Sequence, residues 1–272
     1  MKLSIVSGLN ESKGDQEEIN RDFSSLCDFL KSLGFDGVEL SLLEPEKIDT
    51  QQINDIMNSY DMEISAIGTG STFIRFGYSL GHHDERMRKN AINRLEKYMD
   101  FAFETESIVI IGLIRGRYTA ESSLKKEKLN IISSLKECVR IAENKDVILA
   151  FEPINSFEID SYNTISSSFD LIKDINSDNF QLLIDTFHIN LEEDPGFIWD
   201  DLENICLYVR HIHLADTNRR APGTGHFDFK AFLNIFEKNG YNNYASIETI
   251  MKPSFEDVAK ESMDYLKMIL NR

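Results

Sequence analysis

Ionisable side chains stand at the ends of four short hydrophobic segments in the second half of the chain. Glu152, Asp185 and Glu248 each end one such segment, and a fourth ends in His211-Ile212-His213. Carboxylates brought together without a counter-charge repel one another strongly, and a divalent cation removes that cost. Three carboxylates and one imidazole form an oxygen-rich ligand set, which suits Mn²⁺, Mg²⁺ or Co²⁺ better than a thiolate-binding metal.

A simpler reading exists for each residue taken alone. An acid directly after a strand usually caps the next helix or lies in a solvated loop. Four ionisable groups at the ends of four consecutive segments favour one shared site instead, so we expect a metal centre there.

The segments that must position these groups alternate along the whole chain with longer helical patterns. Several are continuously apolar, which is typical of strands buried on both faces of a parallel sheet. The predicted strands are residues 3–7, 37–42, 63–67, 108–112, 147–152, 181–185, 209–214 and 245–248.

Between these strands, apolar residues recur with the helical period, as in residues 19–33 and 87–102. Gly34 and Gly240 follow two of these patterns and are typical of helix C-termini. Eight βα units without an interrupting linker predict a single-domain (β/α)8 TIM barrel over residues 1–272. Active sites in such barrels lie at the carboxyl ends of the strands, so the four groups are expected to converge.

Composition excludes several classes of partner. The chain has 272 residues and a net charge of −17, which argues against nucleic acid and anionic membranes, because both favour a surplus of Lys and Arg. Three cysteines without a CxxC motif fit a reducing cytosol. The N-terminal apolar run is too short for a signal peptide and no stretch is long enough to span a membrane, so we expect a cytoplasmic protein.

Four groups of residues resemble the D-tagatose 3-epimerase group of the xylose-isomerase-like barrel superfamily. They are Phe151-Glu152-Pro153-Ile154-Asn155, Ile184-Asp185-Thr186-Phe187-His188-Ile189-Asn190, His211-Ile212-His213-Leu214-Ala215-Asp216 with Asn218-Arg219-Arg220-Ala221-Pro222-Gly223, and Ile247-Glu248. The resemblance covers essentially the whole chain. It is carried most specifically by the Asp-Thr-Phe-His-Ile-Asn and Asn-Arg-Arg-Ala-Pro-Gly segments taken together.

The resemblance implies one divalent metal ion, Mn²⁺ ahead of Mg²⁺ or Co²⁺. The implied ligands are Glu152, Asp185, His213 and Glu248. Among them, Glu152 and Glu248 are also the implied catalytic proton-transfer groups. The residues implied to bind substrate are Glu158, His188 and Arg219. His211 and His213 point to the same side of a strand. His213 is chosen because it precedes Leu214-Ala215-Asp216, as in the superfamily's signature, and because it lies nearer the strand's carboxyl end.

The resemblance implies metal-dependent epimerisation at carbon 3 of a small ketose; aldose–ketose isomerisation, which moves a proton between adjacent carbons on one face, stays open as the alternative. A proton next to the carbonyl is removed on one face and returned on the other through an enediolate, which the metal stabilises. We expect no nucleic acid or membrane partner. The oligomeric state, with a homodimer and a homotetramer as the options, stays open.

Alternatives remain at this point. Arg115 and Arg117 follow the fourth strand, where they either hold the tail of a charged substrate, such as a sugar phosphate, a hydroxypyruvate-type acid or an inosose, or form surface ion pairs. The long segment after the third strand carries Phe73, Phe76 and Tyr78, which either anchor a lid or form an apolar wall over the substrate. A phosphodiester endonuclease fits poorly with six histidines and an acidic surface. A non-catalytic sugar-binding barrel is disfavoured by the two glutamates.

Overall fold

The computed structural model describes residues 1–9, 16–196 and 198–270, and its strands form a closed parallel barrel in the order β1 to β8. The strands are β1 Lys2–Gly8, β2 Gly37–Ser41, β3 Glu63–Gly68, β4 Val109–Ile111, β5 Leu149–Phe151, β6 Phe180–Asp185, β7 Val209–Leu214 and β8 Tyr244–Ile247. Pairing of β1 with β8 closes the barrel, with Lys2 opposite Tyr244. The predicted (β/α)8 TIM barrel is therefore confirmed.

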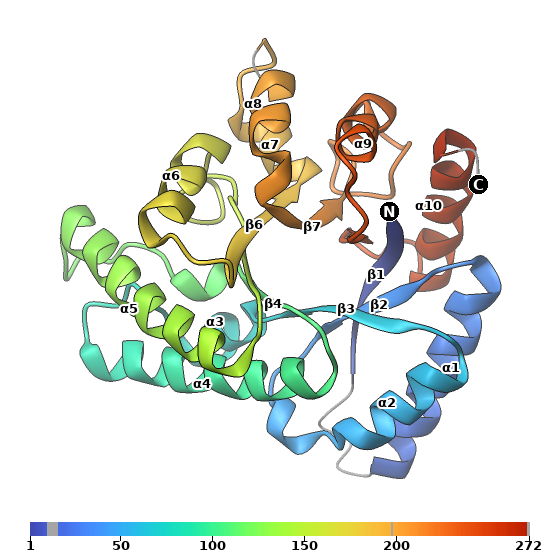
Figure 1. Ribbon diagram of the computed structural model, residues 1–272, viewed down its shortest axis with the longest axis horizontal. Coiled ribbons are helices and arrows are strands. Elements are labelled where there is room, and N and C mark those ends of the chain that lie inside the picture. Colours follow the sequence, from blue (N-terminus) through green and yellow to red (C-terminus); the bar gives the residue numbers. More distant parts are fainter. Residues whose placement is uncertain (10–15, 197, 271–272) are drawn as a thin grey trace.

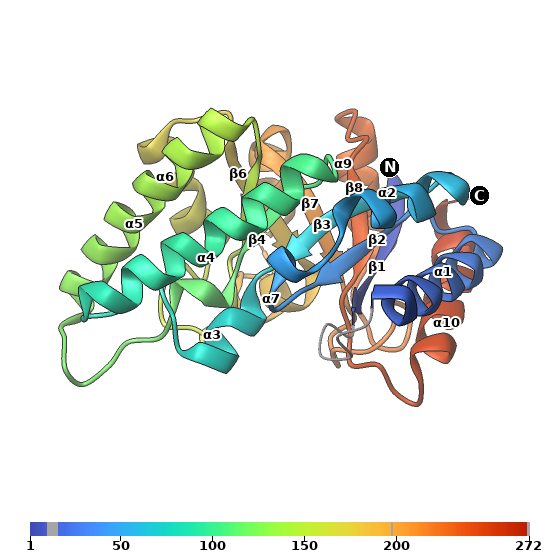
Figure 2. The same ribbon diagram turned by 90° about the horizontal axis from the view of Figure 1, so that it is seen from below.

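Helices cover the outside of the strands (Figure 1). They are α1 Gln16–Leu33, α2 Thr50–Ser59, α3 Gly70–Phe76, α4 Glu85–Glu104, α5 Leu124–Lys145, α6 Ile165–Ile175, α7 Thr186–Glu192, α8 Ile198–Ile205, α9 Phe229–Lys238 and α10 Phe255–Leu270. Short 3-10 turns are η2 Pro45–Lys47, η3 Leu113–Arg115 and η4 Cys206–Tyr208. Helices α4 and α5 pack together on one flank, and α1 packs against α10 on the other (Figures 1 and 2).

Side-chain caps fix where several helices begin. Asp49, Asp84, Ser123 and Thr164 each accept a hydrogen bond from a backbone N–H in the first turn of the following helix. Each cap satisfies a donor that the helix itself leaves free. At the other end, Gly34 (φ +92°) and Gly240 (φ +76°) adopt the left-handed conformation that the sequence predicted for helix ends.

The apolar core has two parts, separated by the sheet. The larger part lies between the strands and the helices. The smaller part lies inside the barrel and comes from neighbouring strands β3 to β6; it consists of Ala66, Ile108, Ile110, Ala150 and Leu183. Alternation of side chains along each strand produces this division, because successive residues point to opposite faces.

The other half of the barrel interior is polar. Ser4 of β1, Glu39 of β2, His211 and His213 of β7 and Ser246 of β8 are at most 2% exposed, and each alternates with outward-facing core residues. The Glu39 carboxylate pairs with both histidines, which offsets the cost of burying these three groups. The chain therefore places an ionisable network, rather than apolar packing, under one side of the barrel mouth.

Strand ends differ slightly from the sequence prediction. Strands β4 and β5 have three residues each, and β5 ends at Phe151, so Glu152 is the first residue after its strand. Glu248 likewise follows β8 directly. Both glutamates lie at the barrel rim, and the N–H of each still donates to the neighbouring strand, Glu152 to Ile111 O and Glu248 to Leu214 O at 3.2 Å. Within the described residues, no helix combines the length and apolar character that crossing a membrane requires.

Candidate active site

Four ionisable groups meet where strands β5 to β8 end. Glu152 follows β5, Asp185 ends β6, His213 lies in β7 opposite Asp185, and Glu248 follows β8. Each offers one ligand atom, and these atoms all lie within 4.8 Å of one another. The structure thus brings together the four groups that the sequence predicted to share a site.

The Nδ1 atom of His213 is at the centre of this group. It lies 3.4 Å from Glu152 Oε1, 3.4 Å from Glu248 Oε2 and 3.9 Å from Asp185 Oδ2. Both His213 Nδ1 and Glu152 Oε1 are buried and have no hydrogen-bond partner within the described part of the chain. Buried polar atoms without partners are costly. A divalent cation among the three oxygens and the nitrogen would satisfy both atoms, so the donor set fits the implied metal.

Asp185 performs two tasks with its two oxygens. Its Oδ1 accepts a hydrogen bond of 2.7 Å from the backbone N–H of Phe187 and thereby caps helix α7. Its Oδ2 faces His213 and the other carboxylates. Asp185 is therefore both a helix cap, through Oδ1, and a candidate metal ligand, through Oδ2.

Glu39 lies beneath the four groups and was missed by the sequence analysis. Its carboxylate accepts a hydrogen bond of 2.9 Å from His211 Nε2 and bonds of 3.1 Å from His213 Nε2. Burial would raise the pKa of Glu39, but the charge of His213 and the bonds from both histidines outweigh it and lower the pKa to about 2. A lone acid inside the buried segment Gly-Val-Glu-Leu-Ser was the available signal.

The contact with Glu39 determines how His213 presents its ring. Because Nε2 donates to Glu39, the lone pair of a neutral ring is on Nδ1, the atom that faces the carboxylates. Burial alone would lower the pKa of His213, yet the carboxylates of Glu39 and Glu248 outweigh it and hold that pKa well above the usual value. A metal ion binding at Nδ1 must displace a proton from this ring.

His188 faces the site from helix α7. Its Nε2 lies 3.7 Å from Glu152 Oε1 and 3.8 Å from Asp185 Oδ2, and its side chain is 2% exposed. Asn155 Nδ2 donates to His188 Nδ1 at 2.7 Å and to Glu158 Oε1 at 2.9 Å. The Asn155 amide is oriented by Phe157, whose N–H donates to its Oδ1. Glu158 itself is exposed, so Asn155 links an exposed carboxylate to a buried histidine.

Arg219 reaches the site from the segment after β7. Its Nη1 donates to Asp185 Oδ2 at 2.7 Å and its Nη2 to Glu248 Oε2 at 2.5 Å. The guanidinium also lies over the ring of Phe187, 4.7 Å from the ring centre. Burial would raise the pKa of Glu248, but the positive charges of His213 and Arg219 outweigh it and hold that pKa well below the usual value.

The two arginines after β4 lie elsewhere. Arg115 is fully buried; its Nη1 donates to the carbonyl oxygen of Glu152 at 2.6 Å and its guanidinium lies 4.7 Å from the Phe151 ring centre. Burial lowers the pKa of Arg115 to about 10. Arg117 is paired with Asp160 at 3.5 Å. Arg115 thus supports the backbone of Glu152 rather than a surface ion pair.

The segment after β3 forms the short helix α3 and lies on the lower side of the molecule in Figure 2. Phe76 and Tyr78 stack with ring centres 5.4 Å apart, and Arg94 of helix α4 lies over Phe76 at 5.8 Å. These contacts favour the anchoring role for Phe76 and Tyr78, because both rings are held against the outer layer of helices.

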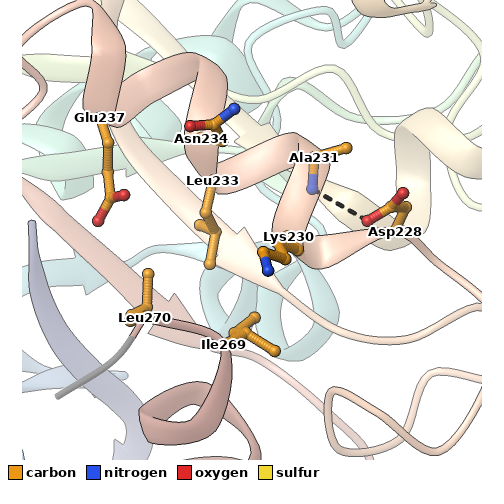
Figure 3. A pocket seen from close by; sticks show the side chains of 8 residues that line it. All are labelled: Asp228, Lys230, Ala231, Leu233, Asn234, Glu237, Ile269 and Leu270. Carbon is orange, nitrogen blue, oxygen red and sulfur yellow. Dashed lines mark hydrogen bonds between the residues drawn. The ribbon is translucent and has the colours of Figure 1, made fainter.

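A separate groove of about 410 Å³ lies between helices α9 and α10 (Figure 3). Asp228 lines it and accepts a hydrogen bond of 2.9 Å from the N–H of Ala231, which caps α9. None of the sequence-predicted site residues lines this groove. We therefore place the candidate active site at the barrel mouth.

Sequence comparison links the chain to a family of barrels. The family described as "Xylose isomerase-like TIM barrel" matches residues 27–269. A probable ketose 3-epimerase of Synechocystis sp. is 26% identical over 91% of this chain and 82% of its own length. The 3-dehydro-D-guloside 4-epimerase of Escherichia coli is 25% identical over 88% of this chain and 90% of its own length.

Solved structures with the same fold are similar over nearly the entire chain. The D-allulose 3-epimerase of Methylomonas sp. superposes with a TM-score of 0.82 at 18% identity and covers 99% of this chain and 98% of that protein. At this identity the likeness concerns the fold alone.

Proposed function

The chain belongs to the xylose isomerase-like TIM barrel family, and from this membership we propose that it is a divalent-metal-dependent ketose 3-epimerase. As its relatives' names indicate, it is an isomerase of the epimerase type. The observation that carries the finer proposal is the convergence of Glu152, Asp185, His213 and Glu248 within 4.8 Å. Three oxygens and one nitrogen suit Mn²⁺, Mg²⁺ or Co²⁺, and the family resemblance makes Mn²⁺ the first choice among them.

In this proposal the four residues hold the cation through one atom each. When bound, the cation would stabilise negative charge that develops on the ketose oxygens as the neighbouring carbon loses its proton. Glu152 Oε1 and His213 Nδ1 support the assignment, because both are buried, lie 3.4 Å apart and have no hydrogen-bond partner among the residues that the structure describes.

Glu152 and Glu248 are proposed to transfer the proton. Inversion requires a base on one face of carbon 3 and an acid on the other, and these carboxylates come from strands at different positions around the barrel. Their surroundings differ: the Glu152 side chain is 7% exposed and that of Glu248 is 32% exposed. Glu248 is therefore the more solvent-accessible of the two carboxylates.

Glu158, His188 and Arg219 are proposed to orient the substrate near its carbonyl end. His188 presents Nε2–H to the site, because its Nδ1 accepts from Asn155. Arg219 carries a planar fork of donors that suits two neighbouring oxygens. Glu158 is held toward His188 through the same asparagine.

We propose that the substrate is an uncharged sugar. A phosphate or carboxylate tail needs an accessible cationic partner, and of the two arginines after β4 one is buried and the other is paired. Arg115 is fully buried against the backbone of Glu152, and Arg117 is paired with Asp160. The charged-substrate alternative therefore has no support from these two residues.

A proton NMR time course in D₂O tests the reaction. The Mn²⁺-loaded protein would be incubated with fructose, tagatose, psicose and ribulose, and separately with their phosphates. We expect a new epimer of a free ketose with deuterium at carbon 3. Deuterium at carbon 1 with an aldose product would instead identify an aldose–ketose isomerase, and turnover of phosphates alone would contradict the uncharged substrate.

Glu152→Gln and Glu248→Gln are the variants that test the proton-transfer roles in the same assay. Each is expected to lose epimerisation while remaining folded, because inversion needs a proton-transfer group on both faces and an amide cannot accept the proton. Mn²⁺ binding must be measured in both, since each residue is also a proposed ligand. Full epimerase activity in either variant would remove that glutamate from the mechanism.

A further inference from the structure

Arg219 contacts the same two carboxylate oxygens that face His213. Its guanidinium donates to Asp185 Oδ2 at 2.7 Å and to Glu248 Oε2 at 2.5 Å. These oxygens lie 3.9 Å and 3.4 Å from His213 Nδ1. One guanidinium therefore neutralises two of the three acids in the cluster, which is the task expected of a cation.

The backbone around Arg219 is built to aim this side chain inward. Its φ of +59° lies in the left-handed region, which costs free energy for a residue with a Cβ atom. The conformation is held from both sides, because Arg219 N–H donates to Asp216 O and Ile250 N–H donates to Arg219 O, each at 2.8 Å.

Phe187 supports the guanidinium from below, with its ring centre 4.7 Å away. The ring belongs to helix α7, whose first turn is capped by the other oxygen of Asp185. The contact of Arg219 with Asp185 is therefore part of a fixed arrangement of helix, ring and carboxylate.

From this geometry we propose that Arg219 is an internal counter-cation that competes with the divalent metal ion for Asp185 and Glu248. The inference rests on the metal site of the proposed function. Loading of the cation releases the guanidinium from these two oxygens and makes it available to the substrate. Arg219 thus keeps the carboxylates compatible with the folded barrel at low metal concentration, at the expense of metal affinity.

The test compares Arg219→Met with Arg220→Met, the next residue in the same segment, whose side chain is exposed. Methionine keeps a Cβ atom at position 219, so the backbone cost of the positive φ is retained. Chelator-treated proteins would be titrated with Mn²⁺ by calorimetry, and their melting temperatures measured with and without Mn²⁺. Neither measurement depends on catalytic activity.

For Arg219→Met we expect Mn²⁺ to bind at least roughly tenfold more tightly than in the wild type, because a positive charge is removed from beside the ion. We also expect a lower melting temperature without Mn²⁺, because Asp185 and Glu248 lose their counter-charge. Arg220→Met should match the wild type in both. Arg219→Lys keeps the charge but reaches one carboxylate at a time. Its Mn²⁺ affinity and its melting temperature without Mn²⁺ should therefore lie between those of the wild type and those of Arg219→Met.

Equal or weaker Mn²⁺ binding by Arg219→Met, with the wild type binding normally, would overturn the competition. If Arg219→Met does not fold after chelation, Arg219→Lys decides: tighter Mn²⁺ binding than the wild type supports the proposal, and equal or weaker binding overturns it. A wild type that binds no Mn²⁺ would overturn the metal site itself. Failure of the proposed function and failure of the counter-cation role are therefore distinguished.

Discussion

His213 uses its two ring nitrogens for different partners. Nε2 donates to Glu39 inside the barrel, and Nδ1 points to Glu152 and Glu248 at the mouth. A carboxylate behind a histidine ligand fixes the tautomer and orientation of the ring. Glu39 therefore prepares Nδ1 for a metal ion. His211 donates to the same carboxylate and packs edge-on against the His213 ring, with ring centres 5.3 Å apart.

At the residue scale, we predict a ranking of effects on Mn²⁺ affinity. His213→Ala removes a ligand and should have the largest effect. Glu39→Gln should weaken binding by about ten- to a hundred-fold, because the glutamine amide can also donate to Nε2 and so no longer fixes the proton on that nitrogen. His211→Ala should have a smaller effect than Glu39→Gln. Calorimetric titration of the folded variants measures all three. A larger loss in His211→Ala than in His213→Ala would exchange the roles of the two histidines.

At the scale of elements, the short strand β4 leaves room for the carboxylate of its neighbour. A Cβ atom at Gly112, directly after β4, would lie 2.7 Å from Glu152 Oε2 and 3.3 Å from Ile154 Cδ1. Contacts this short force one partner to move, and the flexible end of Glu152 moves most easily. The Glu152 carboxylate therefore occupies the space that a side chain at this position would need.

We predict that Gly112→Ala displaces Glu152 while the barrel stays folded. Because small displacements of a site group are costly, Mn²⁺ affinity should fall by about tenfold or more. Gly70→Ala is the matched control, since its Cβ would meet Leu113 Cδ1 at an ordinary 3.5 Å. Circular dichroism would verify folding and calorimetry would measure affinity. Unchanged Mn²⁺ binding by a folded Gly112→Ala would show that Glu152 tolerates the added methyl group.

At the scale of the whole molecule, metal binding and stability are linked. The cluster lies at the ends of β5 to β8, so a cation bound there would connect four of the eight strands. At a concentration one hundred times its dissociation constant, a ligand that binds only the folded state stabilises it by about 2.7 kcal/mol. For a barrel of this size that corresponds to a melting temperature higher by roughly 5 to 10 °C.

We predict that chelation lowers the melting temperature and that Mn²⁺ restores it. The control is Asp185→Asn, which retains a side-chain oxygen to cap α7 but weakens the metal site. Its melting temperature should respond little to Mn²⁺. Differential scanning calorimetry provides the measurement. A wild-type protein that melts at the same temperature after verified metal removal would contradict the metal centre.

Much of the fold and the main cluster was determined by the sequence alone. Hydrophobic runs alternating with helical periods predicted the eight strands, and the parallel arrangement follows from that alternation. Because parallel strands end at the same rim, the groups ending residues 147–152, 181–185, 209–214 and 245–248 had to meet. Their roles as ligands stay a proposal, but their convergence within 4.8 Å is observed.

Contacts between residues that are distant in the sequence depend on closure of the barrel, and the sequence alone did not predict them. Glu39 of β2 and His211 of β7 are 172 residues apart, and they meet inside the barrel because the pairing of β1 with β8 closes it. Arg115 looked equally suited to a substrate tail or a surface ion pair, yet the turn after β4 buries it beneath Glu152. Arg219 reaches Asp185 and Glu248 through a left-handed backbone conformation that no local pattern indicates. Periodicity specifies which face of an element a side chain occupies, whereas contacts between distant elements depend on register and closure, which only the tertiary structure fixes.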